Sequence, residues 1–185
     1  MLYAQLHLTL PPWVHDQVDA DAVYGSAESR IALAVKLSQL NVTHQSGGPF
    51  GAAVFNKAGR LLGVGVNRVV PHYCSAAHAE VLALATTQQR LQKFRLNDDG
   101  ERITLATSAQ PCSMCYGALI WAGIDELLIA ARAEDVQTLA GFDEGPLPND
   151  WKGELEKRGI EVQTDLLRDQ ACAVLKEYGQ SGLVY

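Results

Sequence analysis

The sequence has few positive charges and does not gather them into a cluster. Its 185 residues contain 15 Lys and Arg against 21 Asp and Glu, which gives a net charge of −6. The acidic excess lies from Asp125 onward, where thirteen acidic residues stand against six basic ones. Proteins that bind nucleic acids usually present a basic face or stripe. The charge distribution therefore disfavours a polyanionic partner such as RNA.

Long hydrophobic runs are also missing, and cysteines are few. No apolar stretch approaches the roughly 20 residues that cross a bilayer, so no membrane segment is expected. The first Lys or Arg is Arg30, so the basic start of a secretory signal is absent and a cytoplasmic location is predicted. The four cysteines, Cys74, Cys112, Cys115 and Cys172, have uneven spacings. They indicate metal ligands or reactive thiols rather than a disulfide framework.

The length predicts a single domain over residues 1–185, because a chain of this size can bury a core without disulfides or a structural metal. Residues 1–25 are expected to form an N-terminal lead-in, and residues from about 150 to 185 a C-terminal extension. A metal in such a domain is free to be functional.

Apolar periodicity and turn residues predict helices that alternate with strands. Helices are expected over residues 26–45, 79–94, 111–121, 134–139, 152–157 and 166–178, and strands over residues 52–56, 61–70, 102–107, 126–131 and 160–162. Residues 71–77 are expected to form a loop. The first two strands are joined by a tight hairpin, and the later strands alternate with helices. The sequence thus predicts a three-layer α/β/α fold with a mixed sheet of about five strands.

The strongest chemical signal is the Pro-Cys-x-x-Cys pattern over residues 111–115, which chance rarely produces in a chain with four cysteines. The two cysteines share one face of the first helical turn, and a helix N-terminus favours thiolates. A redox dithiol is one alternative. Half of a structural zinc site is another, and its fourth ligand would come from Cys74, Cys172 or His72.

A His-x-Glu triplet, His78 to Glu80, stands about thirty residues earlier. It is a weak signal alone, but His78, Cys112 and Cys115 together supply three soft ligands, one short of a closed tetrahedral zinc site. Glu80 cannot complete a capping box, because Ala77 stands where Ser or Thr is needed. Its carboxylate is therefore expected beside the open coordination position, where it would carry protons.

The two motifs together resemble the signature of the cytidine deaminase superfamily, whose members are zinc-dependent deaminases of nucleobases and nucleosides. The resemblance covers residues 47 to about 144. It implies a cytidine deaminase-like fold and a Zn²⁺ cofactor held by the His78, Cys112 and Cys115 side chains. It also implies that Glu80 shuttles protons while an activated water attacks an amino-bearing ring carbon. Relatives often carry Glu where this chain has Gln110, so the role of that position stays open.

Three stretches resemble the guanine deaminase branch in particular: residues 47–52, 113–121 and 141–144. The resemblance implies conversion of guanine to xanthine and ammonia, a step of purine catabolism. It further implies a second acid after the Gly-Phe-Asp triplet, which maps to Glu144, although the choice between Asp143 and Glu144 stays open. Without the resemblance, both would be read as solvated loop acids.

The candidate substrate-binding residues are Asn67, Phe50, Ala79, Trp121 and Asp143. Asn67 could instead be a turn residue at a strand end, and Phe50 and Trp121 could fill the core. Cys74 is expected in a loop away from the metal. Four histidines have no motif context and are expected in loops or at the surface: His7, His15, His44 and His72.

The resemblance also bears on partners, because guanine deaminases form dimers whose C-terminal tails close the partner's site. Residues 182–185 would suit such a lid. The sequence therefore predicts a zinc-dependent hydrolytic deaminase of a small amino-heterocycle, a homodimer without nucleic-acid or membrane partners. Guanine is the favoured ring, and an amino-triazine, a pterin or a pyrimidine stays open. The rival functions are deamination of tRNA adenosine or of cytosine and cytidine, and a non-catalytic zinc module.

Overall fold

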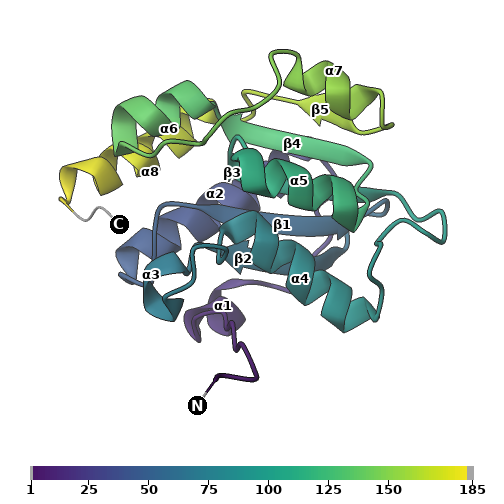
Figure 1. Ribbon diagram of the computed structural model, residues 1–185, viewed down its shortest axis with the longest axis horizontal. Helices are drawn as coiled ribbons and strands as arrows, with labels where there is room; N and C mark the ends of the chain where they lie inside the picture. The colour runs from purple at the N-terminus through teal and green to yellow at the C-terminus, as the bar shows by residue number, and fades with distance from the viewer. Residues whose placement is uncertain (1, 183–185) are drawn as a thin grey trace.

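The computed structural model describes residues 2–182, in which helices and strands alternate along the chain (Figure 1). The strands are β1 (Gly51–Asn56), β2 (Leu61–Val66), β3 (Ile103–Ala109), β4 (Glu126–Ala131) and β5 (Glu161–Gln163). The helices are α1 (Trp13–Gln17), α2 (Ala27–Thr43), α3 (Val69–His72), α4 (Ala79–Leu91), α5 (Ser113–Ala122), α6 (Ala133–Ala140), α7 (Trp151–Glu156) and α8 (Arg168–Gln180). Within the described part of the chain, no helix is both long and apolar enough to cross a membrane.

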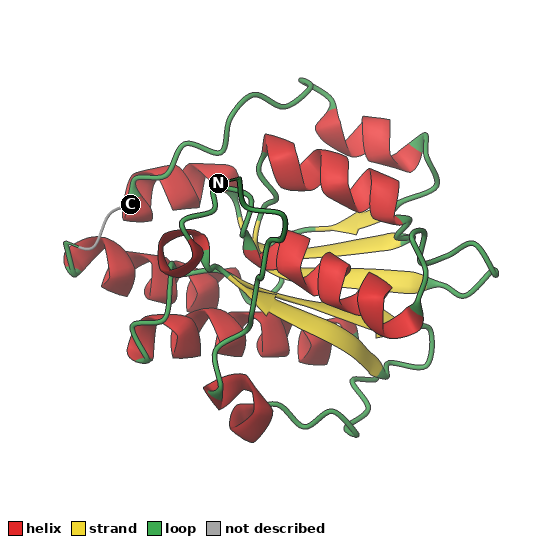
Figure 2. Ribbon diagram, turned by 60° about the horizontal axis from the view of Figure 1, so that its bottom comes forward, coloured by secondary structure: helices red, strands yellow, loops and turns green. Residues whose placement is uncertain are grey.

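The strands form one mixed sheet in the order β2-β1-β3-β4-β5. Strand β1 pairs antiparallel with β2 and with β3, while β3 with β4 and β4 with β5 are parallel. Helices cover both faces of the sheet (Figure 2). Helices α2 and α8 pack on one face, with α6 beside α8, and α4 and α5 pack on the other. The predicted three-layer fold with an antiparallel start and a parallel continuation is confirmed.

Alternate residues of the central strands enter different cores. In β1, Ala53 and Phe55 pack on the side of α2 and α8, whereas Ala52 and Val54 pack on the side of α4 and α5. Successive side chains of a strand point to opposite faces, and both faces are covered here, so every residue of β3 is buried. The helices therefore pack against a sheet whose central strand is fully buried, and this packing fixes the positions of their ends.

The prediction of a strand over residues 61–70 is wrong in its second half. Strand β2 ends at Val66, which pairs with the first residue of β1, so the residues that follow have no strand partner. Residues 69–72 form α3 instead, and the predicted loop over residues 71–77 begins inside this helix. Pro71 fits there because the first turn of a helix does not need its missing N–H.

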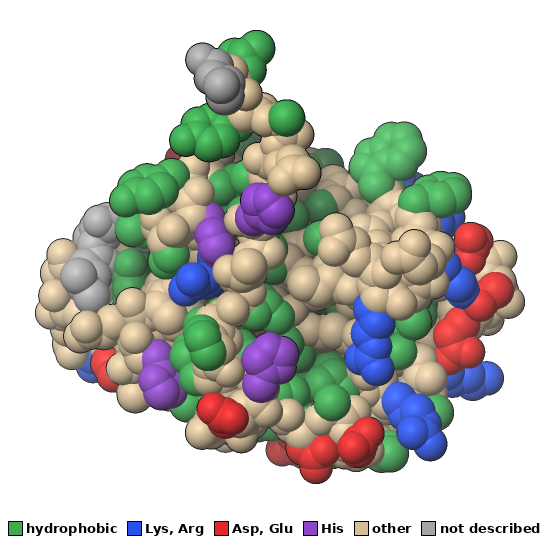
Figure 3. All heavy atoms as spheres, turned by 90° about the horizontal axis from the view of Figure 1, so that it is seen from below, with side chains coloured by type: hydrophobic (Ala, Val, Ile, Leu, Met, Phe, Trp, Pro, Cys, Tyr) green, Lys and Arg blue, Asp and Glu red, His purple; other side chains and the backbone are tan. Residues whose placement is uncertain are grey.

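The two ends of the chain are attached differently. At the N-terminal end, the Thr9 N–H donates to His72 Nε2 at 3.1 Å, and residues 2–7 are exposed and stand away from the body (Figure 3). At the C-terminal end, β5 forms the edge of the sheet, and α8 buries Val174 and Leu175 in the core. The predicted C-terminal extension is thus part of the sheet and of one helical layer.

Candidate active site

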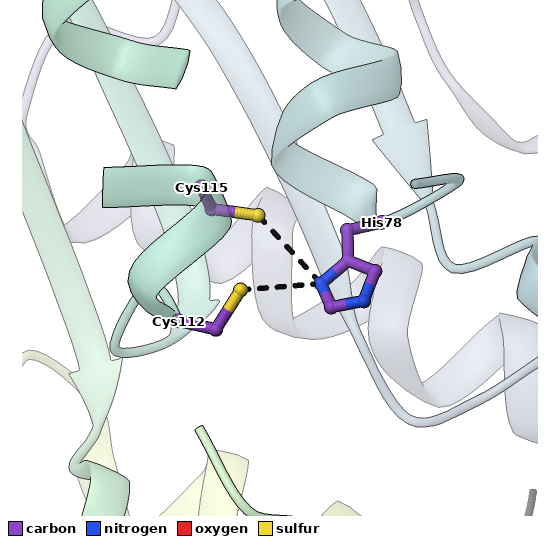
Figure 4. Close-up of side chains that lie close together, drawn as sticks. All are labelled: His78, Cys112 and Cys115. Atoms are coloured by element: carbon purple, nitrogen blue, oxygen red, sulfur yellow. Dashed lines mark hydrogen bonds between the residues drawn. The ribbon is translucent and has the colours of Figure 1, made fainter. Parts of the chain in front are cut away.

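The ends of two helices bring His78, Cys112 and Cys115 together. His78 is the N-cap of α4 and Cys112 the N-cap of α5, and both have extended backbone conformations. Neither side chain caps its own helix, so the imidazole and the thiol turn toward each other (Figure 4). His78 Nδ1 lies 3.5 Å from Cys112 Sγ and 3.6 Å from Cys115 Sγ. Among residues 2–182, they are the one group of three or more His, Cys, Asp or Glu side chains that could hold a metal ion.

The close approach of α4 to the sheet depends on a small residue in β2. A Cβ atom at Gly65 would overlap the carbonyl oxygen of Ala79, the first residue of α4. The glycine therefore lets the start of α4, and with it His78, lie against the strand. The Gly-Val-Gly sequence in β2 thus has a packing role.

The three ligand atoms fit zinc. Bond lengths of about 2.0 Å to nitrogen and 2.3 Å to sulfur in a tetrahedron place the nitrogen and each sulfur about 3.5 Å apart. The two distances found, 3.5 and 3.6 Å, agree with this geometry. Cys74 and Cys172 are free thiols outside the cluster. Three protein ligands are typical of catalytic rather than structural zinc sites.

Hydrogen bonds and burial shift the pKa values of the two thiols of the cluster in opposite directions. The hydrogen bond from Cys115 lowers the pKa of Cys112 to about 4, against the opposing effect of burial. The same hydrogen bond, together with burial, raises the pKa of Cys115. Burial would lower the pKa of His78, but the Cys112 sulfur and the charge of Glu80 outweigh it, so the net shift is upward. The Cys112 thiolate offers a charged ligand atom to a metal ion, and metal binding would release protons from the cluster, because Cys115 binds as a thiolate and His78 as a neutral imidazole.

Glu80 lies in the first turn of α4 and is only 6% exposed. Its Oε1 accepts a hydrogen bond from Thr107 Oγ1 at 3.3 Å, and its Oε2 lies 3.4 Å from Cys115 Sγ. Burial raises the pKa of this carboxyl group. A carboxyl group that is held in place beside a reacting group can accept and return a proton, and a raised pKa makes it a better base. Sequence reasoning missed Thr107, because a threonine in a buried strand carries no motif.

A cavity of about 120 Å³ adjoins this cluster. Its lining residues come from four separate parts of the chain: Phe50, Asn67, His78, Ala79, Glu80, Phe142, Asp143 and Glu144. All the candidate substrate-binding residues except Trp121 are among them. Phe142 was missed, although it stands inside the Gly-Phe-Asp triplet that drew attention to its neighbours. Its ring meets that of Phe50 nearly edge-on, with centroids 5.3 Å apart and planes at 60°.

Asn67 is 1% exposed and also holds the loop before β1. Its Oδ1 accepts from the N–H groups of Gly48 and Val69, at 3.3 Å each. Its backbone carbonyl accepts from Asn41 Nδ2 at 2.9 Å. Asn67 therefore has the turn role that was the alternative interpretation, and it lines the cavity as well.

The two acids of the 142–145 loop have different surroundings. Asp143 is exposed, and its Oδ1 accepts a hydrogen bond from the Gly145 N–H at 2.8 Å. Glu144 is half-buried, and burial together with the nearby charges of Glu80 and Cys112 raises the pKa of Glu144 to about 8. The ionisation of Glu144 therefore depends on the charges of the cluster.

Two further positions lie outside the cavity: Trp121, which was predicted to bind substrate, and Gln110, whose role was left open. Trp121 is 81% exposed, so it belongs neither to the cavity nor to the core, and its prediction as a substrate-binding residue is wrong. It stands six residues after Cys115 on α5, which turns it away from the face that carries the cysteines. Gln110 lies outside the cavity, where its Oε1 accepts from the Ala133 N–H at 3.4 Å at the start of α6.

Residues 26–131 match the family described as the cytidine and deoxycytidylate deaminase zinc-binding region. The chain belongs to this family. Guanine deaminase from Bacillus subtilis is 35% identical over 133 residues, which cover 72% of this chain and 81% of that protein. A tRNA-specific adenosine deaminase from Haemophilus influenzae is 32% identical over 71% of each chain.

Solved structures of related deaminases match along nearly the whole chain. The guanine deaminase from Nitrosomonas europaea is 47% identical, with a TM-score of 0.91 over 97% of this chain and 99% of that one. A 48% identical protein solved in complex with 2,6-diaminopurine has a TM-score of 0.91 over 98% of this chain and 96% of that one. These matches extend through the C-terminal extension of this deaminase, which the family match at residues 26–131 does not reach.

Proposed function

We propose that this deaminase hydrolyses the exocyclic amino group of guanine, so that guanine and water give xanthine and ammonia, a reaction of purine catabolism. The observation that carries the proposal is one small cavity that joins the three-ligand cluster, the buried Glu80 and the second acid Glu144. Guanine presents several ring nitrogens beside its amino group, and one carboxylate cannot easily serve all of them. The similarity to guanine deaminases from two bacteria supports the same substrate.

Zn²⁺ is the proposed cofactor, held by His78 Nδ1, Cys112 Sγ and Cys115 Sγ. When bound, zinc would activate the attacking water near neutral pH by lowering its pKa. The residues of the chain would do the rest. Glu80 would take the proton from the water and pass it to the ring, while its hydrogen bond with Thr107 holds the carboxylate in place. Glu144 would supply a proton to the departing amino group and would take back the proton of the hydroxyl group that becomes the new ring carbonyl.

The cavity walls suit a flat ring without an attached sugar phosphate. Phe50 and Phe142 present aromatic surface on one side, and Ala79 is small enough to leave room for the ring edge. Asn67 and Asp143 are proposed to contact polar ring atoms. A cavity of about 120 Å³ is small for a nucleotide, and its acidic lining would repel a phosphate.

The rival functions make different predictions. A tRNA adenosine deaminase should bind tRNA with a strong salt dependence, whereas the net charge of −6 disfavours that partner. A structural zinc module would need a fourth protein ligand, and within residues 2–182 no such ligand joins the cluster. Cytosine or cytidine deamination would leave the second acid without an evident task.

A homodimer is proposed on the character of α5. This helix has no charged residue, and Trp121 and Met114 on it are 81% and 38% exposed. A helix that is apolar on all sides is usually covered on all sides.

The proposed C-terminal lid falls largely on residues 183–185, which lie outside the described residues. Size-exclusion chromatography with light scattering tests the dimer, and a chain cut after Gly182 tests the lid. A cytoplasmic location is proposed because the thiol ligands need a reducing compartment.

The deciding experiment measures ammonia release by the zinc-loaded protein over a panel of guanine, adenine, cytosine, cytidine, a pterin and an amino-triazine. Guanine is expected to give the highest kcat/KM. Turnover of cytosine or cytidine without turnover of guanine would overturn the substrate assignment. A tRNA shift assay across a salt series should detect no binding by this protein. A basic tRNA-binding protein serves as the positive control and should shift the tRNA.

A further inference from the structure

The backbone of Glu144 is fastened to the helix that carries both cysteines. The Ser113 N–H donates to the Glu144 carbonyl oxygen at 3.0 Å. Ser113 is the first residue of α5 and stands between Cys112 and Cys115 in the sequence. The first N–H groups of a helix have no partner within the helix, so this bond gives one of them a partner in a segment about thirty residues away.

The 142–145 loop is shaped for this approach. The Gly145 N–H donates to Asp143 Oδ1, which turns the chain tightly around Glu144. Gly145 has a φ of +70°, and a Cβ atom there would lie 2.7 Å from Ser113 Oγ. The start of α5 and the loop are therefore packed as closely as a glycine allows.

We propose that Ser113 is a positioning residue, whose backbone N–H sets the distance between the Glu144 carboxyl group and the three-ligand cluster. This rests on the proposed function of Glu144 as the second acid. The first turn of α5 carries both cysteines and the Ser113 N–H donor. The hydrogen bond to Glu144 therefore fixes the distance between the 142–145 loop and the cluster, although the two come from different elements. Misplacement of a proton donor by about 1 Å can cost on the order of a hundredfold in rate.

Proline at position 113 removes this contact with little other damage. Proline is favoured at the first position of a helix, and its ring removes only the N–H in question. The residue before a proline must be extended, and Cys112 already has φ −65° and ψ 171°. Ala27→Pro is the matched control, since Ala27 is the first residue of α2 after the extended Ser26, and its N–H makes no hydrogen bond within residues 2–182.

The experiment measures kcat and KM for guanine and the zinc content of the wild type, Ser113→Pro, Ala27→Pro, Glu144→Gln and the double variant Ser113→Pro/Glu144→Gln. Ser113→Pro should lower kcat by about 10- to 100-fold, with zinc retained and KM changed by less than about threefold. Ala27→Pro should keep the wild-type kcat. The double variant should be no slower than Glu144→Gln alone, because a residue that acts through Glu144 has nothing left to position.

The outcomes separate this inference from the proposed function. Additive losses in the double variant, loss of zinc in Ser113→Pro, or equal kcat values for Ser113→Pro and Ala27→Pro would each overturn the positioning role. Wild-type kcat in Glu144→Gln, or no ammonia from guanine with the wild type, would overturn the proposed function and this inference with it. Ser113→Ala, which keeps the N–H, should lose at most about twofold, so a large loss there would assign the effect to the side chain instead.

Discussion

The cavity has two walls that are built in different ways. On one side, His78, Cys112 and Cys115 sit at helix ends that pack directly on a buried sheet, and their spacing follows from two short motifs. On the other side, the 142–145 loop has no regular structure, and it contacts α5, Phe50 before β1, and α8. The comparison teaches that the metal-ligand side is local and rigid, whereas the second acid depends on tertiary contacts that can be removed one at a time.

The largest effect should come from the rigid wall. Glu80→Gln keeps the size of the side chain and a partner for Thr107, but the amide cannot carry a proton. We expect kcat to fall by about 10²- to 10⁴-fold while one zinc per chain remains bound. Ammonia release and elemental analysis measure the two quantities. An active Glu80→Gln enzyme would show that proton transfer does not pass through this residue.

The next effect tests the two acids of the 142–145 loop against each other. Glu144→Gln should lower kcat for guanine by about 10- to 100-fold, on the scale of a lost proton donor. Asp143→Asn should cost less than about tenfold, since an amide oxygen can still accept the hydrogen bond from the Gly145 N–H. Steady-state assays of both variants decide the order. A larger loss in Asp143→Asn would exchange the roles of the two residues.

A smaller effect is expected where the 142–145 loop meets α8. The ring of Tyr178 stacks on Phe142, with centroids 5.9 Å apart and planes at 28°, and Phe142 in turn meets Phe50. Aromatic pairs contribute about 0.5–1.5 kcal/mol each. Tyr178→Leu should therefore raise KM for guanine by about two- to tenfold, and Tyr178→Phe should keep the wild-type KM. If both variants behave alike, the stacking does not shape the cavity.

The smallest effect on activity is expected at the ion pair between Asp135 of α6 and Arg168 of α8. Arg168 Nη2 lies 2.7 Å from Asp135 Oδ1, and this hydrogen bond lowers the pKa of Asp135 to about 2. Arg168→Ala should lower the free energy of unfolding at pH 7, because Asp135 loses its ion-pair partner, with kcat changed less than about twofold. Urea unfolding and the guanine assay measure the two.

The pH dependence of that stability follows from the sign of the shift. A lowered pKa in the folded state means that the stabilisation is complete above the unfolded value of 3.8 and is lost as the pH falls toward about 2. The difference between wild type and Arg168→Ala should therefore shrink below about pH 4. A difference that stays constant down to pH 2 would assign the stabilisation to packing of the arginine stem.

Much of the fold and all but one of the residues that line the cavity could be predicted from the sequence. Periodicity located the strands and helices, with the main error after Val66, where the end of β1 removed the strand partner. Trp121 was misplaced because motif spacing gives the position along a helix but not which face the sheet covers. Thr107, which donates to Glu80, stands in no motif, and the Gly-Phe-Asp triplet did not show that the Phe142 ring lines the cavity.

The sequence by itself determined the three candidate ligands, the Glu beside them and the alternation of strands and helices, because these depend on two short motifs and on simple periodicity. Only the tertiary structure decided which loop acid is buried, that Asn67 both holds a loop and lines the cavity, and that Ser113 bonds the backbone of Glu144. These features join segments some twenty to thirty residues apart. Their distances are set by the packing of helices on the sheet, which no local pattern records.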